Sequence, residues 1–272
     1  MDNEEQERLR VRFNPDGSLL RRHQQRMLEM LRYIDVICKK YDIVYWLSSG
    51  TLIGAVRHGG YIPWDDDVDI EMLREDYKKF VKVMEIEALK GRYILQTHDT
   101  DPNYFAPYGK LRDLHSYIKE ENTIDLYYKY KGCYIDVFIL EPSSSFFLSR
   151  LGSTVLGVLL YRANSIFKNK VLRRVYYTFT YPLVYNIVFP ILRLFSKCGA
   201  KGRLRLALGS FFFCSRDKAD IFPLKVLKFE DYYFPVPGQY DNYLRKIYGD
   251  YMKLPNLDKL RKHTNNAEIY EC

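Results

Sequence analysis

The apolar positions between residues 18 and 40 recur at steps of three, four and seven, which predicts an amphipathic helix with one buried face. The positions that define this face are Leu20, Met27, Leu31, Ile34 and Cys38. Ser18 precedes the periodic stretch and is a suitable cap for the helix N-terminus. Residues 43–47 form an uninterrupted apolar run, which predicts a buried strand that ends at Ser48-Ser49-Gly50.

Further helices and strands alternate along the chain. Residues 67–72 alternate acidic and apolar side chains, as expected of a strand with one polar face. The glycines and proline of 58–63 predict a loop. We expect helices over 51–57, 74–90 and 240–248, strands over 92–97, 108–112 and 134–140, and a hairpin over 225–237. This order indicates an α/β (α+β) fold, with a mixed sheet flanked by helices.

The segment 142–218 differs from the rest of the chain. Between Pro142 and Arg216 there are twelve Lys or Arg and no Asp or Glu, whereas the rest carries 30 of the 42 basic residues and all 34 acidic ones. Its apolar runs, 153–161 and 181–195, fall short of the ~20 uninterrupted apolar residues of a spanning helix. We expect a mainly helical insert that rests on an anionic membrane surface or holds an anionic glycan.

The pattern divides the chain into three segments: a catalytic core over 1–141, the basic insert over 142–218, and a segment 219–272 that packs back on the core. Hydrophobic residues make up 47% and charged residues 28%, which is typical of a globular protein. The five cysteines are scattered, without the spacing of a zinc site, and the charged N-terminus lacks an apolar signal region. We therefore expect a cytoplasmic protein, on the inner face of the cell membrane if the insert binds lipid.

An acidic cluster, Asp65-Asp66-Asp67-Val68-Asp69, follows the 58–63 loop. On a strand, residues i and i+2 share a face, so Asp67 and Asp69 are expected side by side at roughly 6–7 Å. Paired carboxylates repel each other unless a cation neutralises them, and oxygen ligands suit Mg²⁺ or Mn²⁺. An acidic run alone is more often a solvated turn. Asp136, in an apolar strand, supplies a third carboxylate and favours a metal site.

The turn Ser49-Gly50-Thr51 lies between the first expected strand and helix. Backbone N–H groups at a helix N-terminus bind phosphate oxygens, and glycine lets a ligand approach the chain closely. Glycines end many strands, so the turn alone is weak evidence. Its position beside the acidic cluster is what favours a phosphate site.

Four segments together resemble the LicD family, whose relatives include fukutin and fukutin-related protein, in the nucleotidyltransferase superfamily. These segments are residues 46–70, 110–113, 134–138 and 248–255. The resemblance implies a nucleotidyltransferase-like fold and transfer of phosphocholine from CDP-choline to a surface glycan such as lipopolysaccharide, capsule or teichoic acid. Relatives imply ribitol phosphate or glycerol phosphate from a CDP-alditol as alternatives.

The resemblance also implies roles for individual residues. Asp67, Asp69 and Asp136 would hold the metal, and Gly50 and Thr51, with Ser49 beside them, would meet the donor phosphates. From the chemistry of the transfer itself, a carboxylate, Asp66 or Asp136, is expected to accept the proton of the glycan hydroxyl. Candidate phosphate contacts are Arg57, Lys110 and Arg112, and candidate substrate contacts are His58 and His263. If the cargo is choline, its ammonium needs aromatic neighbours. The nearest candidates are Trp64, Tyr61, Tyr104 and Tyr108.

Two other functions fit parts of the sequence. True nucleotidyl transfer would release pyrophosphate from a triphosphate rather than CMP from a CDP-alcohol. The basic, aromatic segment with a sequence pI of about 9.0 would also permit nucleic-acid binding. No recognition motif supports nucleic-acid binding, and the apolar runs are too long for a solvated groove. We therefore expect a CDP-alcohol and a glycan or lipid-linked glycan as partners, and no nucleic acid.

Overall fold

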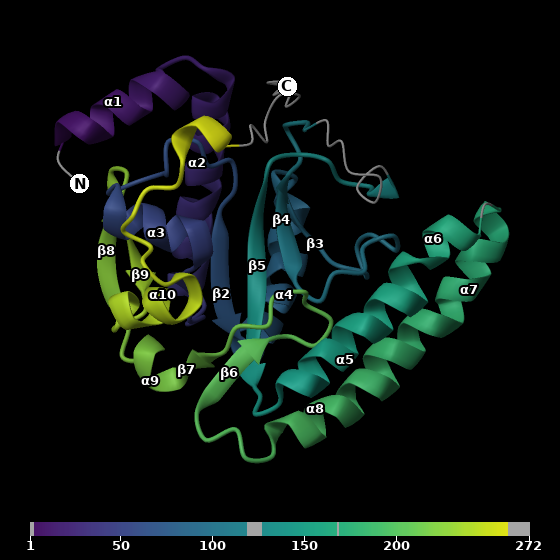
Figure 1. Cartoon of the computed structure of the whole chain (residues 1–272). Coiled ribbons are helices and arrows are strands. Elements are labelled where there is room, and N and C mark those ends of the chain that lie inside the picture. Colours follow the sequence, from purple (N-terminus) through teal and green to yellow (C-terminus); the bar gives the residue numbers. More distant parts are fainter. Residues whose placement is uncertain (1–2, 119–126, 168, 261–272) are drawn as a thin grey trace.

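The computed structural model of the chain describes residues 3–118, 127–167 and 169–260. Within these residues a seven-stranded mixed sheet forms the centre of the molecule, in the order β1-β2-β5-β4-β3, with β6 paired to β5 and β7 to β6 (Figure 1). Strands β2 and β5 are parallel, and the other neighbours are antiparallel. The strands are β1 Trp46–Leu47, β2 Asp69–Leu73, β3 Tyr93–Gln96, β4 Gly109–Asp113, β5 Tyr134–Pro142, β6 Arg203–Leu206 and β7 Arg216–Asp217.

Helices and a small hairpin surround this sheet. Helices α2 and α4 contact β5 and β2 and lie behind the sheet in Figure 1, whereas the β8–β9 hairpin lies beside α3. The elements are α1 Asn3–Phe13, α2 Leu19–Lys40, α3 Ser49–Arg57, α4 Arg74–Glu87, η1 Ala88–Lys90, α9 Lys218–Ile221, β8 Lys225–Phe229, β9 Tyr232–Val236, α10 Tyr240–Tyr248 and η5 Leu257–Lys259. The α/β fold with helices flanking a mixed sheet is confirmed.

Helix α2 follows from its sequence pattern. The Ser18 hydroxyl accepts a hydrogen bond from the Arg21 backbone N–H at 3.1 Å, which caps the helix as expected. Its predicted apolar face is buried, with Met27, Leu31 and Ile34 fully inaccessible to solvent. The predicted α10 and the hairpin β8–β9 are confirmed as well.

The two central strands have one polar and one apolar face. Asp69 of β2 is the register partner of Asp136 of β5, and Ile70 is the partner of Val137. Because side chains alternate along a strand, both aspartates project from the same face, and Ile70 and Val137 project from the other. The apolar pair lies in the main hydrophobic core, which leaves the carboxylates on the opposite surface.

A long pair of helices projects from the sheet at the lower right of Figure 1. We call residues 146–197 the helical hairpin. Its elements are α5 Phe146–Leu156, η3 Gly157–Tyr161, α6 Ala163–Ile166, α7 Lys170–Pro182, η4 Leu183–Val188 and α8 Phe189–Lys197. It has a small core of its own, which includes Leu156, Leu160, Tyr177, Val184 and Phe189.

The second half of the helical hairpin is longer than its sequence pattern predicts. Elements α7, η4 and α8 join into one helix, Val171–Lys197, of 27 residues. Its most apolar window has a mean hydropathy of 1.2 and is 17% buried. By length and composition alone this helix could cross a membrane, which contrasts with the shorter runs counted in the sequence.

The helical hairpin is tied to the sheet by one buried carboxylate. Glu141, at the end of β5, contacts Arg74 of α4 and Arg193 of α8, each at 2.6 Å. Its other oxygen accepts the backbone N–H of Leu208 at 3.0 Å. The direction of α8 relative to the core is thereby fixed by charge-assisted hydrogen bonds.

Predicted boundaries differ from the structure at three places that matter for the acidic site and the insert. The apolar run 43–47 contributes only Trp46–Leu47 to the sheet. Strand β2 begins at Asp69, so Asp67 lies in the preceding loop and not on the strand. Residues 203–206 and 216–217 pair with the core sheet, so the helical part of the predicted insert ends at Lys197. Such sheet pairing of short segments leaves no local periodicity to detect.

Candidate active site

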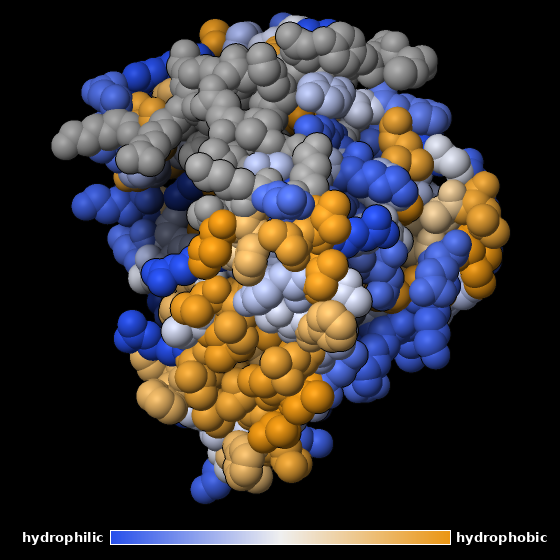
Figure 2. All heavy atoms as spheres, turned by 90° about the vertical axis from the view of Figure 1, so that its right-hand side faces the viewer, coloured by the Kyte–Doolittle hydropathy of each residue, from blue (hydrophilic) through white to orange (hydrophobic). Residues whose placement is uncertain are grey.

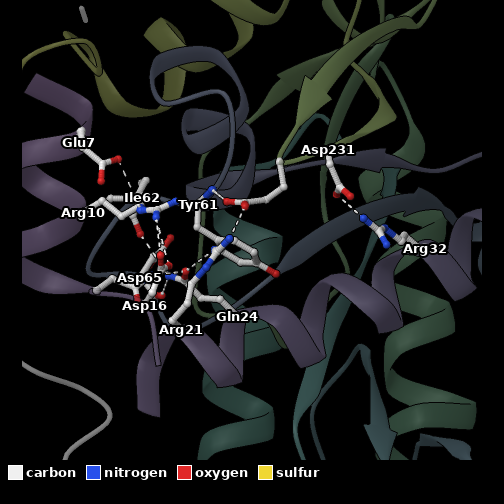
Figure 3. Close-up of polar contacts among 12 residues, drawn as sticks. Glu7, Arg10, Asp16, Arg21, Gln24, Arg32, Tyr61, Ile62, Asp65 and Asp231 are labelled. Carbon is white, nitrogen blue, oxygen red and sulfur yellow. Dashed lines mark hydrogen bonds and ion pairs between the residues drawn. The ribbon is translucent and has the colours of Figure 1, made fainter. Parts of the chain in front are cut away.

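The acidic loop that precedes β2 is held by two polar side chains of α2. Gln24 Nε2 donates to the carbonyl oxygen of Asp65 at 2.8 Å (Figure 3). His23 Nε2 lies 2.9 Å from the carbonyl oxygen of Asp66, and His23 Nδ1 lies 3.3 Å from Cys133 Sγ. Burial lowers the pKa of His23. A neutral ring that donates through Nε2 and accepts from the thiol satisfies both contacts.

The glycine loop before the acids is closed against the β8–β9 turn. The Glu230 carboxylate accepts the Tyr61 backbone N–H at 3.1 Å and contacts Arg21 Nη2 at 2.7 Å. A Cβ at Gly60 would overlap the end of the Glu230 side chain, which would have to move away from its present position. Helix α2 and the β8–β9 hairpin therefore position the loop from two sides.

The N-terminus of α3 faces this loop. A Cβ on Gly50 would lie 2.7 Å from Asp65 Oδ2, which shows how closely the backbone approaches the carboxylate. Thr51 Oγ1 accepts the backbone N–H of Asp69 at 2.9 Å, and Ser48 N–H donates to the Asp69 carbonyl oxygen at 3.0 Å. Ser49 adopts a φ of 50°, in the left-handed region that is unusual for a non-glycine residue. The Ser49-Gly50-Thr51 turn thus lies directly beside the acids.

The carboxylates form one electrostatic group. Burial raises the pKa of Asp69 well above its ordinary value, and the charges of Asp67, Asp136 and Asp65 add to the effect. Burial and then the Asp136 charge raise the pKa of Asp67 to about 6. The pKa of Asp65 is raised by burial and by Asp67 and Asp66. Four neighbouring acids thus repel one another on a surface with little solvent, an arrangement that favours a cation.

Lys110 is the basic residue that enters this group. Its Nζ lies 2.7 Å from Asp136 Oδ1, and both side chains are 12% exposed. The same Nζ lies 3.6 Å from the centre of the Tyr134 ring and 5.9 Å from that of Tyr108. Lys110 and Asp136 are register partners on β4 and β5, so the strand pairing itself places the ammonium over the sheet face.

The donor chemistry of the four aspartates suits a divalent cation, because all of them supply hard carboxylate oxygens and the pKa values of Asp65, Asp67 and Asp69 are raised. Across residues 3–118, 127–167 and 169–260, however, no group of three or more His, Cys, Asp or Glu is arranged so that it could hold a metal ion. Asp136 contacts Lys110 in this arrangement. The metal site of Asp67, Asp69 and Asp136 therefore stays a prediction.

Two predicted phosphate contacts have structural partners instead. Arg57 is 9% exposed, and its Nη1 donates to the carbonyl oxygen of Tyr251 at 2.6 Å. Arg112 has no exposed surface, and its Nε and Nη1 donate to Gln96 and Gly132, each at 2.9 Å. Both guanidinium groups fix backbone or side-chain carbonyls in the protein interior. The Arg57 charge also acts on Asp65 of the acidic group. The predicted phosphate contacts of Arg57 and Arg112 stay predictions.

His58 and Trp64 pack against the N-terminal helix. The Trp64 ring lies 5.3 Å from that of Phe13 and 6.1 Å from that of His58, in edge-to-face contacts. His58 Nδ1 lies 2.5 Å from Gln6 Oε1. Burial and the Arg57 charge lower the pKa of His58 to about 3, so the ring is neutral at pH 7. Their predicted substrate contacts remain predictions, and His263 lies outside the described residues.

The four aromatic candidates for a choline cage do not form one group. Tyr61 lies in the core with its ring 4.8 Å from that of Phe229, and Trp64 packs on the N-terminal helix. Tyr104 and Tyr108 contact each other edge to face, and the Asp136 charge contributes to the raised pKa of both, after burial. Tyr104 and Tyr108 therefore lie beside Asp136, whereas Tyr61 is close enough to Asp65 and Asp67 for their charges to raise its pKa, after burial and the Glu230 charge.

The sequence analysis missed a buried network on the same sheet face. Glu71, two residues after Asp69 and fully buried, contacts Arg216 at 2.7 Å. Glu71 Oε2 also accepts hydrogen bonds from Tyr243 at 2.7 Å and from Trp46 at 3.1 Å. The alternation of residues 67–72 places Glu71 on the face of Asp69, but nothing local identifies its partners.

Comparison with known proteins agrees with this arrangement. Residues 42–152 match the family model of the LicD/FKTN/FKRP nucleotidyltransferase domain. The lipopolysaccharide cholinephosphotransferase LicD of Haemophilus influenzae is 28% identical over 257 residues, which cover 90% of this chain and 95% of that protein. The ribitol 5-phosphate transferase FKRP of Homo sapiens is 46% identical over 48 residues, or 18% of this chain and 10% of that protein.

The fold, the acidic sheet face and the matched family model define residues 42–152 as a nucleotidyltransferase domain. The match to the LicD family model covers this domain, and the similarity to LicD extends along 90% of the chain; together they support a LicD-like phosphotransferase. The resemblance stated from the sequence segments is thereby confirmed.

Proposed function

We propose that this protein transfers phosphocholine from CDP-choline to a hydroxyl group of a cell-surface glycan, in the cytoplasm and with Mg²⁺ or Mn²⁺. The observation that carries the proposal is the group of Asp65, Asp67, Asp69 and Asp136 beside the N-terminus of α3. LicD of Haemophilus influenzae, which is similar to this chain along nearly its whole length, is a lipopolysaccharide cholinephosphotransferase. This similarity supports phosphocholine as the transferred group and a glycan as the acceptor.

The reaction is a displacement at phosphorus. A glycan hydroxyl oxygen forms a bond to the phosphorus that carries choline, and the bond from that phosphorus to the bridging oxygen breaks, so CMP leaves with the electron pair. The hydroxyl proton passes to a carboxylate, Asp66 or Asp136. Such a reaction depends on alignment of the two groups and on neutralisation of the diphosphate more than on covalent help from the protein.

The residues of this site divide these tasks. Asp67, Asp69 and Asp136 would hold the metal ion, which supplies charge neutralisation for the leaving phosphate when bound. The backbone N–H groups of the Ser49-Gly50-Thr51 turn, at the N-terminus of α3, are available for a phosphate oxygen. Lys110 carries the positive charge nearest to Asp136 and reinforces the neutralisation of the diphosphate.

Ribitol phosphate is the second candidate cargo. The specific support is the similarity to two ribitol phosphate transferases, FKRP of Homo sapiens and FKTN of Mus musculus, the latter 39% identical over 54 residues. Each match covers 12% or less of those proteins. The similarity to LicD spans far more of this chain, so phosphocholine is preferred.

A donor panel tests the proposal. The purified chain is incubated with CDP-choline, CDP-ribitol or CDP-glycerol, with and without Mg²⁺ and extracted glycan, and CMP release is measured. We expect CMP from CDP-choline only when both Mg²⁺ and glycan are present, and its loss on chelation with EDTA. Release of pyrophosphate from CTP, with no CMP from any CDP-alcohol, would show nucleotidyl transfer instead.

A further inference from the structure

The outer surface of the helical hairpin is apolar and uncovered. Figure 2 shows a broad hydrophobic area on the side of the molecule that faces right in Figure 1. We call the stripe along α7, η4 and α8 the hairpin face. Its six residues, between 46% and 73% exposed, are Leu172, Val175, Phe179, Leu183, Ile187 and Leu194. They follow one another at steps of three and four, apart from the last, so they lie along one side of the helix.

The opposite side of the same helix is packed against the protein. Tyr177, Val184 and Phe189 are at most 7% exposed and belong to the small core of the helical hairpin, with Leu156 and Leu160. A helix that crossed a bilayer would have to leave these partners and expose both sides. Its length permits spanning, but its packing favours a helix that lies flat in the plane of a membrane surface.

Charge identifies the kind of surface that this face meets. From residue 142 to 216 the chain has twelve basic residues and no acidic one. Among the described residues, Arg150, Arg162, Arg174 and Lys197 of the helical hairpin are exposed to solvent. Exposed apolar side chains on a segment that has exposed basic residues and no acidic one complement an anionic lipid surface.

A second copy of this chain fits the hairpin face less well. Two such surfaces brought together would oppose two sets of basic residues with no acid from either segment 142–216 to neutralise them. Like charges held at a contact raise the free energy of association, whereas anionic headgroups lower it. The distribution of charge therefore favours lipid over self-association.

We propose that the hairpin face binds in plane to a bilayer that contains anionic lipid, and so holds the active site at the membrane surface. The binding itself is independent of the catalytic proposal. What membrane binding implies about the acceptor rests on the proposed function. An enzyme held at this surface would act on a glycan linked to lipid.

Vesicle sedimentation tests the binding with the full chain. Vesicles of phosphatidylcholine with phosphatidylglycerol are compared with phosphatidylcholine alone. The double variant Leu172→Glu/Phe179→Glu should bind the anionic vesicles about tenfold or more weakly, because it puts two charges into the apolar contact. The matched control is Ile86→Glu/Val226→Glu, whose two positions are 61% and 62% exposed on α4 and β8. It should bind as the native chain does.

The outcomes that overturn the proposal are distinct. Absence of native binding to anionic vesicles at low salt would refute it, as would equal loss in the Leu172/Phe179 and Ile86/Val226 variants. Light scattering that shows a dimer abolished only by Leu172→Glu/Phe179→Glu, without vesicle binding, would assign the hairpin face to a second copy. Resistance of the bound chain to alkaline carbonate extraction would show a spanning helix rather than one in plane.

A separate readout distinguishes this proposal from the catalytic one. CMP release with a soluble, lipid-free glycan should be unchanged in Leu172→Glu/Phe179→Glu, whose circular dichroism should match the native spectrum. Asp69→Asn should bind vesicles normally and release no CMP. If Asp69→Asn retains turnover while the vesicle results hold, the catalytic proposal fails and the membrane proposal stands.

Discussion

The sheet face and the helical hairpin arrange their residues in opposite ways. The sheet face buries charge, and its Glu71 has no exposed surface and contacts Arg216 and Tyr243. The helical hairpin exposes apolar side chains, with Phe179 at 73%. Buried charges and large exposed apolar areas are both unusual in soluble proteins, and both generally indicate function. Glu71 of the sheet face is therefore satisfied by partners within the protein, whereas the hairpin face is left exposed by the part of the chain that the structure describes.

Substitution of an aspartate on the sheet face should have the largest effect on activity. Asp69→Asn should reduce CMP release by about a thousandfold or more, since it removes a proposed metal ligand. It should also raise the midpoint of thermal unfolding by a few degrees, because it relieves repulsion among carboxylates whose pKa values are raised. Asp231→Asn, at a surface aspartate that contacts Arg32 (Figure 3), is the control and should change neither quantity. A functional Asp69→Asn enzyme would contradict the site assignment.

The buried ion pair of the sheet face gives the next largest effect. Arg216→Leu should lower the free energy of unfolding by about 3–5 kcal/mol, because Glu71 keeps a buried charge without its partner. Adding Glu71→Gln should recover part of that loss, since the amide removes the charge and still offers an acceptor to Tyr243. Urea denaturation measures both variants. The exposed Arg245→Ala is the control, and an Arg216→Leu variant as stable as that control would disprove the energetic role of the pair.

The two sides of the helical hairpin should respond unequally. Leu160→Ala, in the small core, should cost about 2–5 kcal/mol of unfolding free energy through lost burial and a cavity. Phe179→Ser, on the hairpin face, should change it by less than about 0.5 kcal/mol in the absence of membranes. Chemical denaturation of both variants in the same buffer makes the comparison. Equal costs would mean that the hairpin face is covered within the free protein.

The smallest effect concerns acid stability at the loop before β2. Burial lowers the pKa of His23 in the folded chain, so its contribution is present above the ordinary pKa of ~6.5 and is lost as the pH falls below it. Stability should fall by up to about 1.4 kcal/mol per pH unit from this group. His23→Gln should flatten the pH dependence between 7 and 5. An unchanged slope would show that His23 is not buried in its neutral form.

Much of the local structure could be predicted because it has a local cause. The spacing of Met27, Leu31 and Ile34 specifies the buried side of α2. The acidic–apolar alternation around Asp69 and the apolar run around Asp136 indicate the two central strands. Alternation alone does not show that Asp67 lies ahead of β2. The acidic–apolar alternation already begins at Asp67, two residues before the strand itself starts at Asp69. Strand ends depend on the neighbouring strand, which the sequence does not show.

The missed features depend on distant parts of the chain. Arg216 and Glu71 are far apart in sequence, so neither predicts the other. Gln24 of α2 contacts the loop that contains Asp65. The sequence feature that could have indicated this contact is a polar residue on the buried side of an amphipathic helix. Arg57 and Arg112 were predicted to bind phosphate because they are basic and near the motif. Their burial and their contacts with interior carbonyls are set by tertiary packing and could not be predicted from the sequence.

A donor labelled separately in its choline and cytidine parts tests the central claim most directly. The full chain is incubated with this CDP-choline, Mg²⁺ and extracted glycan, and both labels are followed. The account predicts choline label on the glycan in equal amount to cytidine label released as CMP, and neither with Asp69→Asn. Cytidine label on the glycan, or transfer that persists in Asp69→Asn, would contradict it.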